Sequence, residues 1–490
     1  MKKLVTATAL VGTSSLFGAF TALLRTKLLA VFLGTAGVGL LAQLGVFGNV
    51  LVSLASLGVG VGMAKYVAEF ASVGDHAALA RLKRTGTAFT WAASVLVVIV
   101  VCALSDVLAR RLFGGRPGLG WSVIVTALSV PFVVQFTFHL SIIQGLKRMK
   151  EYAWATAVGP ALGLLAVVPL VYFFRWNGAV VHLALAAVLG YVAVRVISRR
   201  VLAPLSAVAA GGFDRRLVRE LLAYGVSSLV VGALYWLNLL TVRSVIIGRL
   251  GADANGLYQV AVGLSIQYLM LILNSVAAYS YPRLSELKDR ESVIGEVRAA
   301  VRLSILLVTG CACSFLLLRR WLIPLLFARE FMAAESLLPV QFLADFFRAG
   351  AWMLGIWLLP QGRLRVWVGF DVLMNATLLS SFLLLLARLP AYGAAALLAA
   401  PIAHCVAYLI HFVLIYWYSR RRIGFSFGPS LGRLLVTSAG LIIVCGLAPA
   451  GHPGVTVGGF CLLAAWARLS VSASEIRAAL GIVRNRLSGK

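Results

Sequence analysis

Acidic side chains are scarce in this sequence, since Asp and Glu together number 16 among 490 residues. No loop holds a pair of carboxylates suited to acid and base catalysis, and no nucleophile with a placed base or phosphate-binding loop is present. The six cysteines lie in or beside apolar runs, without the spacing of a zinc site or a disulfide framework. The sequence therefore predicts a protein that is not an enzyme and that needs no metal or cofactor.

Apolar residues dominate instead. Hydrophobic residues make up 61% of the chain and charged residues 12%, and the mean hydropathy is +0.96. These values are typical of an all-α polytopic membrane protein. A net charge of +28 would suggest a nucleic-acid partner for a soluble protein, but here most Lys and Arg residues separate apolar segments. We therefore expect membrane lipid as the surroundings and no nucleic-acid partner.

Apolar runs of about 20 residues, the length that crosses a bilayer as a helix, recur along the whole chain. They predict fourteen transmembrane helices, near residues 5–32, 39–64, 87–109, 119–144, 153–174, 177–198, 218–247, 255–281, 300–318, 333–359, 366–387, 391–418, 431–450 and 454–473.

The distribution of basic residues predicts the orientation of these helices. If the N-terminus is cytoplasmic, the segments that face the cytoplasm, together with both termini, hold 30 of the 44 Lys and Arg residues, against 9 in the opposite loops. Basic residues concentrate on the cytoplasmic side of membrane proteins. Both termini are therefore expected in the cytoplasm.

Two short patterns recur at one constant displacement of 217 residues. In the first, Leu-Gly is followed five residues later by Gly-Leu: Leu33, Gly34, Gly39 and Leu40 match Leu250, Gly251, Gly256 and Leu257. In the second, Gln144, Gly145 and Arg148 match Gln361, Gly362 and Arg365. Two patterns that share one displacement indicate a duplicated unit.

The duplication predicts three parts: an N-terminal six-helix bundle over residues 1–216, its repeat over 217–423, and the last two helices with a basic tail over 424–490. Because each repeat has an even number of helices, both enter the membrane from the same side. Such parallel repeats are related by an axis along the membrane normal, and we expect a central cavity between them.

Among the cations in the predicted helices, those that the spans place inside the membrane as candidates are Arg25, Lys27, Arg243 and Arg348. Charged side chains are costly in a bilayer and usually face a cavity or a partner. Guanidinium groups suit bidentate contacts with phosphate, so these four residues are candidates for binding an anionic group. Alternatively, Arg25, Lys27 and Arg243 extend to the interface from the ends of over-long helices.

Three further residues are candidates for coupling to an ion. Asp345 lies three residues before Arg348 on one helix face. Either the two charges neutralise each other in an ion pair, or Arg348 binds an anionic ligand while Asp345 takes up a proton or sodium ion. Asp371 is a coupling carboxylate or an interfacial one. His139 is a proton site or forms a hydrogen bond between helices.

Several stretches resemble a known family. RTKLLAVFLGTAGVGL, GVGVGMAKYVAEF, YPRLSEL, LLFAREF and LADFFRAGAWMLGIWLLPQGRLRVWVGFDVLMNATLL are similar to sequences of the Wzx flippases for O-antigen and enterobacterial common antigen. These flippases belong to the multidrug/oligosaccharidyl-lipid/polysaccharide exporter superfamily. The resemblance covers residues 1 to about 420 and is most specific over 25–70 and 315–375.

The resemblance implies a translocase of the bacterial inner membrane. Its substrate would be an undecaprenyl-pyrophosphate-linked oligosaccharide, moved from the cytoplasmic to the periplasmic leaflet. Related flippases have cationic residues in the central cavity, a pattern that Arg25 matches. Members are thought to couple to ion gradients, so H⁺ or Na⁺ and the polysaccharide polymerase machinery are further candidate partners.

Two alternatives remain open at this point. An ion-coupled drug or solute antiporter of the same superfamily would be expected to centre on carboxylates in the membrane, whereas here cations dominate. A membrane glycosyltransferase or ligase would be expected to carry a large domain or an acidic loop outside the membrane, and the longest extramembrane segment here is short and basic.

Overall fold

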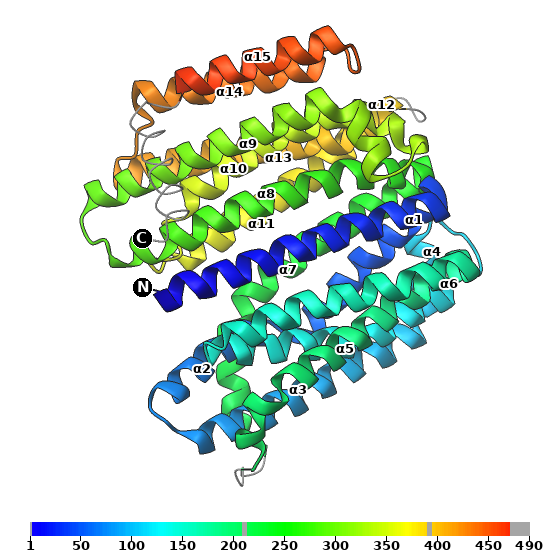
Figure 1. Cartoon of the computed structure of the whole chain (residues 1–490), viewed down its shortest axis with the longest axis vertical. Helices are drawn as coiled ribbons and strands as arrows, with labels where there is room; N and C mark the ends of the chain where they lie inside the picture. Colours follow the sequence, from blue (N-terminus) through cyan, green and yellow to red (C-terminus); the bar gives the residue numbers. More distant parts are fainter. Residues whose placement is uncertain (1, 208–212, 390–393, 471–490) are drawn as a thin grey trace. The chain divides into compact units, whose positions relative to one another are not determined.

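The computed structural model describes residues 2–207, 213–389 and 394–470, and this part of the chain consists of helices and the turns between them (Figure 1). The helices are α1 (Lys2–Ser56), α2 (Val59–Ser72), α3 (His76–Ala103), α4 (Ser105–Leu112), α5 (Gly120–Gly145), α6 (Met149–Ala207), α7 (Arg215–Leu250), α8 (Ala252–Glu286), α9 (Arg290–Leu326), the 3₁₀ helix η1 (Arg329–Leu337), α10 (Leu338–Gly355), α11 (Leu364–Arg388), α12 (Ala394–Leu397), α13 (Ala399–Ile423), α14 (Gly428–Leu447) and α15 (Pro453–Ser470).

Ten helices of the described part are long and apolar enough to cross a membrane. Two of these ten are interrupted, α1 at Gly34 with φ 64° and α6 at Arg175 with φ 48°, and each covers two of the predicted spans. The 18-residue helices α10 and α15 match the two remaining predicted spans. The prediction of an all-α polytopic membrane protein is confirmed.

Several predicted helix boundaries are wrong, because a helix cap and residues with positive φ place the helix ends elsewhere. The segment 65–84 was expected to lie outside the helices, but α2 continues to Ser72 and α3 begins at His76. Asp75 caps α3 by accepting a hydrogen bond from the Ala78 amide at 2.8 Å. The predicted helix 39–64 breaks at Leu57 and Gly58, which both have positive φ. The predicted helix 333–359 is η1 followed by α10, which ends at Gly355.

The described chain divides into two compact units. The first consists mainly of residues up to Gln259 and takes in Leu326–Phe331, and the second contains Val260–Leu325, Met332–Arg388 and the helices from α12 onward. In the first unit α7 packs against α1 and α2, and α6 packs against α1 and α5. In the second, α13 packs against α10 and α11. The boundaries of the three predicted parts, including the one at 216, stay a prediction.

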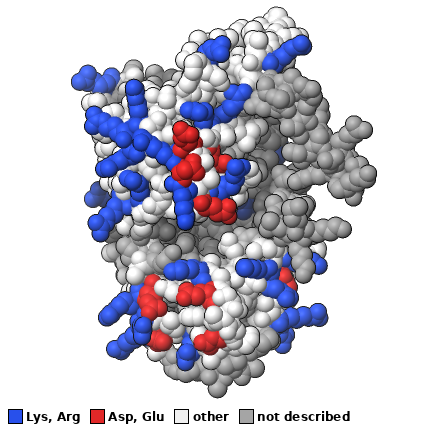
Figure 2. All heavy atoms as spheres, turned by 90° about the vertical axis from the view of Figure 1, so that its left-hand side faces the viewer, with Lys and Arg blue, Asp and Glu red and all other residues white. Residues whose placement is uncertain are grey.

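Exposed basic side chains lie near the α2–α3 turn in the first unit and near the α8–α9 turn in the second. Figure 2 shows the side on which α2 meets α3 and α8 meets α9, and Lys and Arg are prominent there on both units. The exposed basic residues near these turns are Arg81 and Arg84 in the first unit and Lys288, Arg290 and Arg298 in the second. This clustering agrees with the charge bias of the sequence, and the cytoplasmic placement of this end stays a prediction.

Within the first unit, the two copies of the Leu-Gly pattern touch each other backbone to backbone. A β-carbon on Gly39 would lie 2.1 Å from the carbonyl oxygen of Ala252, and one on Gly256 would lie 2.1 Å from that of Thr35. A displacement of 217 residues takes Gly39 to Gly256 and Thr35 to Ala252, so the two contacts are equivalent in the two copies of the pattern. The duplicated glycines therefore form a reciprocal crossing between α1 and α8 that admits no side chain.

We expect Gly39→Ala and Gly256→Ala each to destabilise the folded protein. The added methyl group meets a backbone carbonyl that no rotamer change can move, and overpacking of this kind costs about 1–3 kcal/mol. The measurement is the melting temperature of the purified protein in detergent. Gly45→Ala is the matched control, because a β-carbon there has no other atom within 4 Å. A Gly256→Ala variant that melts with the wild type would contradict the crossing.

Candidate functional site

Arg25 lines a cavity inside the first unit. The cavity has a volume of about 250 Å³ and lies between the first half of α1, α5 and α6. Its walls are small or apolar, and no acidic residue lines it; they consist of Gly18, Thr21, Ala22, Val133, Phe136, Gly159, Pro160, Gly163, Ala186, Ala187 and Gly190. Glycine and alanine leave the space into which the guanidinium group projects.

Arg25 is an exposed residue that lines the cavity, and its guanidinium makes no hydrogen bond or ion pair with any residue that the structure describes. His182 is close enough to interact electrostatically with Arg25. His182 is 1% exposed, and neither of its ring nitrogens has a hydrogen-bond partner. A buried polar group normally has a partner. The cavity therefore combines an available cation with an unsatisfied imidazole.

His182 was not among the residues singled out from the sequence. A β-carbon on Gly163 would lie 3.8 Å from the His182 Cε1 atom, which places the ring beside the cavity wall. The only signal in the sequence is a lone histidine in an apolar run, and that pattern is equally common in packed cores.

Lys27 forms a structural contact within the first unit. Its Nζ donates a hydrogen bond to the carbonyl of Phe327, the residue that follows the end of α9. A cation is favourable at a helix C-terminus, where carbonyl groups lack partners. Lys27 and Arg25 are two residues apart and so do not share a helix face.

Arg243 is buried, with 1% of its surface exposed. Its Nη1 donates to Asn255 Oδ1 at 3.2 Å and its Nη2 to Gln259 Oε1 at 2.6 Å, while the Tyr258 ring lies 5.2 Å from the guanidinium carbon. The Nε group has no acceptor. Neutral amide oxygens thus hold the arginine without neutralising its charge, and no carboxylate of the described part pairs with it.

The remaining predicted charges lie together in the second unit. Asp345 on α10 is 1% exposed and accepts hydrogen bonds from Ser265 Oγ at 2.6 Å and from the Tyr268 hydroxyl at 2.9 Å. Arg348 lies over the Tyr408 ring at 5.3 Å, and its charge acts on both Asp345 and Asp371. The structure therefore brings Arg348 near two carboxylates.

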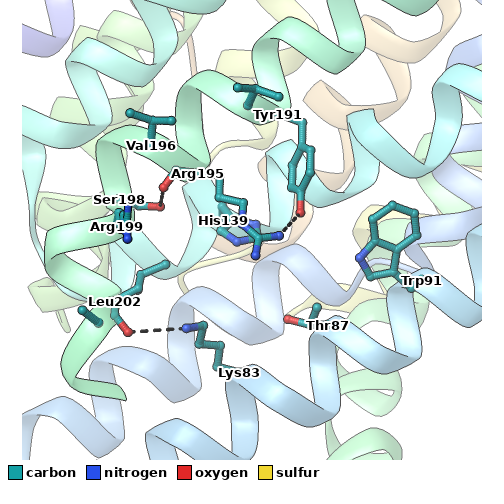
Figure 3. Close-up of a pocket in the computed structure, with 12 residues that line it drawn as sticks. Lys83, Thr87, Trp91, His139, Tyr191, Arg195, Val196, Ser198, Arg199 and Leu202 are labelled. Atoms are coloured by element: carbon teal, nitrogen blue, oxygen red, sulfur yellow. Dashed lines mark hydrogen bonds between the residues drawn. The ribbon is translucent and has the colours of Figure 1, made fainter. Parts of the chain in front are cut away.

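His139 faces a second cavity of the first unit, which Figure 3 shows in close-up. It is 7% exposed, and its Nδ1 lies 2.8 Å from the carbonyl oxygen of Gln135. This hydrogen bond is within α5 rather than between helices. Lys83 and Arg195 line the same cavity. Sequence reasoning missed both as site residues. The signal in the sequence was a spacing of four residues, which places Lys83 with Thr87, and Tyr191 with Arg195, on one helix face.

The sequence is similar to that of a known family and of curated relatives. The sequence matches the family described as "Polysaccharide biosynthesis protein" over residues 4–288. It is 28% identical over 394 residues to the lipid III flippase of Escherichia coli (strain K12), a match that covers 80% of this chain and 92% of the relative. The lipid III flippase of Shigella flexneri gives the same figures.

Solved structures share the fold. The lipid II flippase MurJ in an inward closed conformation has a TM-score of 0.70 at 10% identity, covering 98% of this chain and all of that chain. A multidrug resistance MATE family transporter of the MOP superfamily, in an inward-facing conformation, has a TM-score of 0.64 at 15% identity, covering 86% of this chain and 96% of its own. At these identities the likeness shows the fold alone.

We expect Arg243→Lys to destabilise the protein, although the charge is kept. An ammonium group is a compact donor and does not reproduce the fork that reaches both Asn255 and Gln259, and a hydrogen bond from a charged group contributes about 1.5–3 kcal/mol. The measurement is the melting temperature. Arg249→Lys is the control, because Arg249 is exposed at the end of the same helix. Equal melting of the two variants would show that the fork contributes nothing.

Proposed function

The chain belongs to the polysaccharide biosynthesis protein family, and we propose that it is a flippase for lipid-linked oligosaccharides. The substrate would be an oligosaccharide on undecaprenyl pyrophosphate, the repeat unit of O-antigen or a related surface polysaccharide. The observation that carries the proposal is the similarity to lipid III flippases over 80% of this chain and 92% of the relative. This function is transport and requires no catalytic residue.

The location and direction of transport are part of the proposal. The protein would lie in the bacterial inner membrane with both termini in the cytoplasm, as the bias of basic residues predicts. The two six-helix repeats would alternate in opening to the two sides, so that the oligosaccharide moves from the cytoplasmic to the periplasmic leaflet.

The central physical problem of such a flippase is the pyrophosphate. Its charges cannot cross the hydrocarbon core, about 30 Å thick, without groups that replace their hydration. Arg25 supports an anion-binding role because it has no acceptor among the described residues and lines a cavity without carboxylates. Arg243, Lys27 and Arg348 remain candidates, but each already contacts protein groups.

The Arg25 cavity suits the anion better than the sugars. At about 250 Å³ it is smaller than the usual site of a drug-sized ligand. The oligosaccharide would therefore extend beyond this cavity while the pyrophosphate contacts Arg25, and the polyprenyl chain would stay in lipid. His182, beside the same cavity, would donate a hydrogen bond to a phosphate oxygen.

Coupling to an ion would use the second unit. Asp345 has the surroundings expected of a proton or sodium site, since it is buried, accepts two hydroxyl hydrogen bonds and lies near Arg348. Asp371 and His139 are the further candidates from the sequence. The same carboxylate would serve an ion-coupled antiporter, which is the second candidate function and is consistent with the MATE-like fold.

We expect Arg25→Gln to slow translocation at least tenfold. Loss of a hydrogen bond from a charged donor to phosphate costs about 1.5–3 kcal/mol, which corresponds to roughly ten- to hundredfold. The measurement is the arrival of undecaprenyl-pyrophosphate oligosaccharide in the opposite leaflet of proteoliposomes, read by a glycosidase added outside.

Arg110→Gln is the matched control, because Arg110 is exposed on α4 and contributes to neither cavity. A wild-type protein that moves no lipid-linked oligosaccharide would refute the flippase. If wild type and Arg25→Gln are equally fast, the flippase stands and the anion is held elsewhere.

Asp345→Asn should remove the dependence of transport on an imposed proton or sodium gradient, because the neutral amide cannot exchange a proton or balance a cation. Binding of the substrate by the detergent-solubilised protein should change less than threefold. The measurement compares transport with and without each gradient in the same proteoliposomes. An Asp345→Asn protein that still responds to the gradient would exclude this carboxylate as the coupling site.

A further inference from the structure

The cavity that contains His139 has features that the transport proposal does not use. Its volume is about 670 Å³, and it lies between the first turns of α3, the second half of α5 and the last turns of α6. Figure 3 shows Lys83, Thr87 and Trp91 along one helix and Tyr191, Arg195 and Arg199 along another. The basic ends of these helices are expected where the spans leave the apolar part of the bilayer.

Three cations line this cavity, and no carboxylate does. The charges of Lys83 and Arg195 are close enough to repel each other. Arg195 is held in place by its own helix, because Nη1 donates to the Tyr191 hydroxyl at 2.8 Å. Arg199 is exposed and makes no hydrogen bond or ion pair with the described residues. An anion between these groups would relieve the repulsion and accept hydrogen bonds from several donors.

The cavity continues into an apolar surface. Val192 and Val196, on the same helix as the arginines, also line it and are 50% and 67% exposed. Trp91 and Tyr191 supply rings with an apolar body and a polar tip, which suit the boundary between headgroups and acyl chains. A cationic end beside exposed valines matches the shape and polarity of a lipid with an anionic headgroup.

We infer that this pocket, lined by Lys83, Arg195 and Arg199, binds the phosphate-bearing headgroup of an anionic lipid. Two sources carry this chemistry: an anionic phospholipid of the surrounding bilayer, or a polyprenyl pyrophosphate on its way to or from the Arg25 cavity. The inference does not depend on the flippase proposal, because a bilayer phospholipid would fill the pocket whatever the protein transports.

The experiment is native mass spectrometry of the full-length, delipidated protein in detergent. The protein is titrated separately with phosphatidylglycerol, with undecaprenyl pyrophosphate that carries no sugar, and with net-neutral phosphatidylcholine. The test variant is the double substitution Lys83→Gln with Arg195→Gln. The control is Arg110→Gln with Arg111→Gln, which removes the same charge from exposed positions on α4.

We expect at least one anionic lipid to bind wild type and the control equally, and the test variant at least tenfold more weakly. Loss of phosphatidylglycerol binding identifies a bilayer lipid as the source. Loss of undecaprenyl pyrophosphate binding alone identifies the carrier lipid. A variant with Lys83→Gln and Arg195→Lys keeps the charge at position 195 and should bind the anionic lipid more tightly than the test variant.

Two results would overturn the inference: equal binding of both anionic lipids by the test and control variants, or phosphatidylcholine binding as tight as that of the anionic lipids. If the double variant does not fold, Arg199→Gln replaces it, since this exposed residue has no bond to lose. That variant should weaken anionic lipid binding at least threefold, and unchanged binding counts against the pocket. Transport is not measured, so a failure here leaves the flippase proposal standing.

Discussion

The contact between the two duplicated glycines is the constraint on which the first unit depends. Gly39 and Gly256 bring two backbones together so closely that no β-carbon fits at either position. The crossing also orders polar groups around it, because Asn255 donates to the Gly39 carbonyl at 2.6 Å and its Oδ1 accepts from Arg243 at 3.2 Å. A steric requirement in the backbone therefore fixes the position of a buried cation.

The cations within the helices have two different environments. Lys27 donates to a backbone carbonyl and Arg243 donates to two side-chain amides, so both charges contribute to contacts between helices. Arg25 and Arg199 have no acceptor in the described protein and line cavities. Because each of these guanidinium groups lines a cavity and lacks an acceptor among the described residues, these two residues are the ones that favour an external anion.

One helix connects the two cavities of the first unit. Gly190 of α6 lines the cavity of Arg25, and the next residue, Tyr191, lines the pocket of Arg195. The small residues before Gly190 leave room at the contact with α1 and α5, while the larger and basic residues after Tyr191 surround the outer pocket. A rotation or shift of this part of α6 would change both cavities together, since a helix moves as a rigid element.

The membrane class, the succession of apolar helices and the family could be predicted from the sequence, and the duplication stays a prediction. These follow from the length of apolar runs, from glycines at a constant displacement and from motif likeness, which are local properties. It also identified Arg25 and Asp345 as unusual, since a charge in an apolar run is conspicuous in any fold. It could not separate Arg25 from Arg243.

The packing of the helices determines that Arg243 has amide partners and that Arg25 has none among the described residues, because both partners of Arg243 lie on the next helix, α8. The same holds for the pocket of Lys83 and Arg195, whose residues are more than a hundred positions apart. In the sequence they are indistinguishable from ordinary basic helix ends. Their convergence without a carboxylate exists only because α3 and α6 pack around the end of α5.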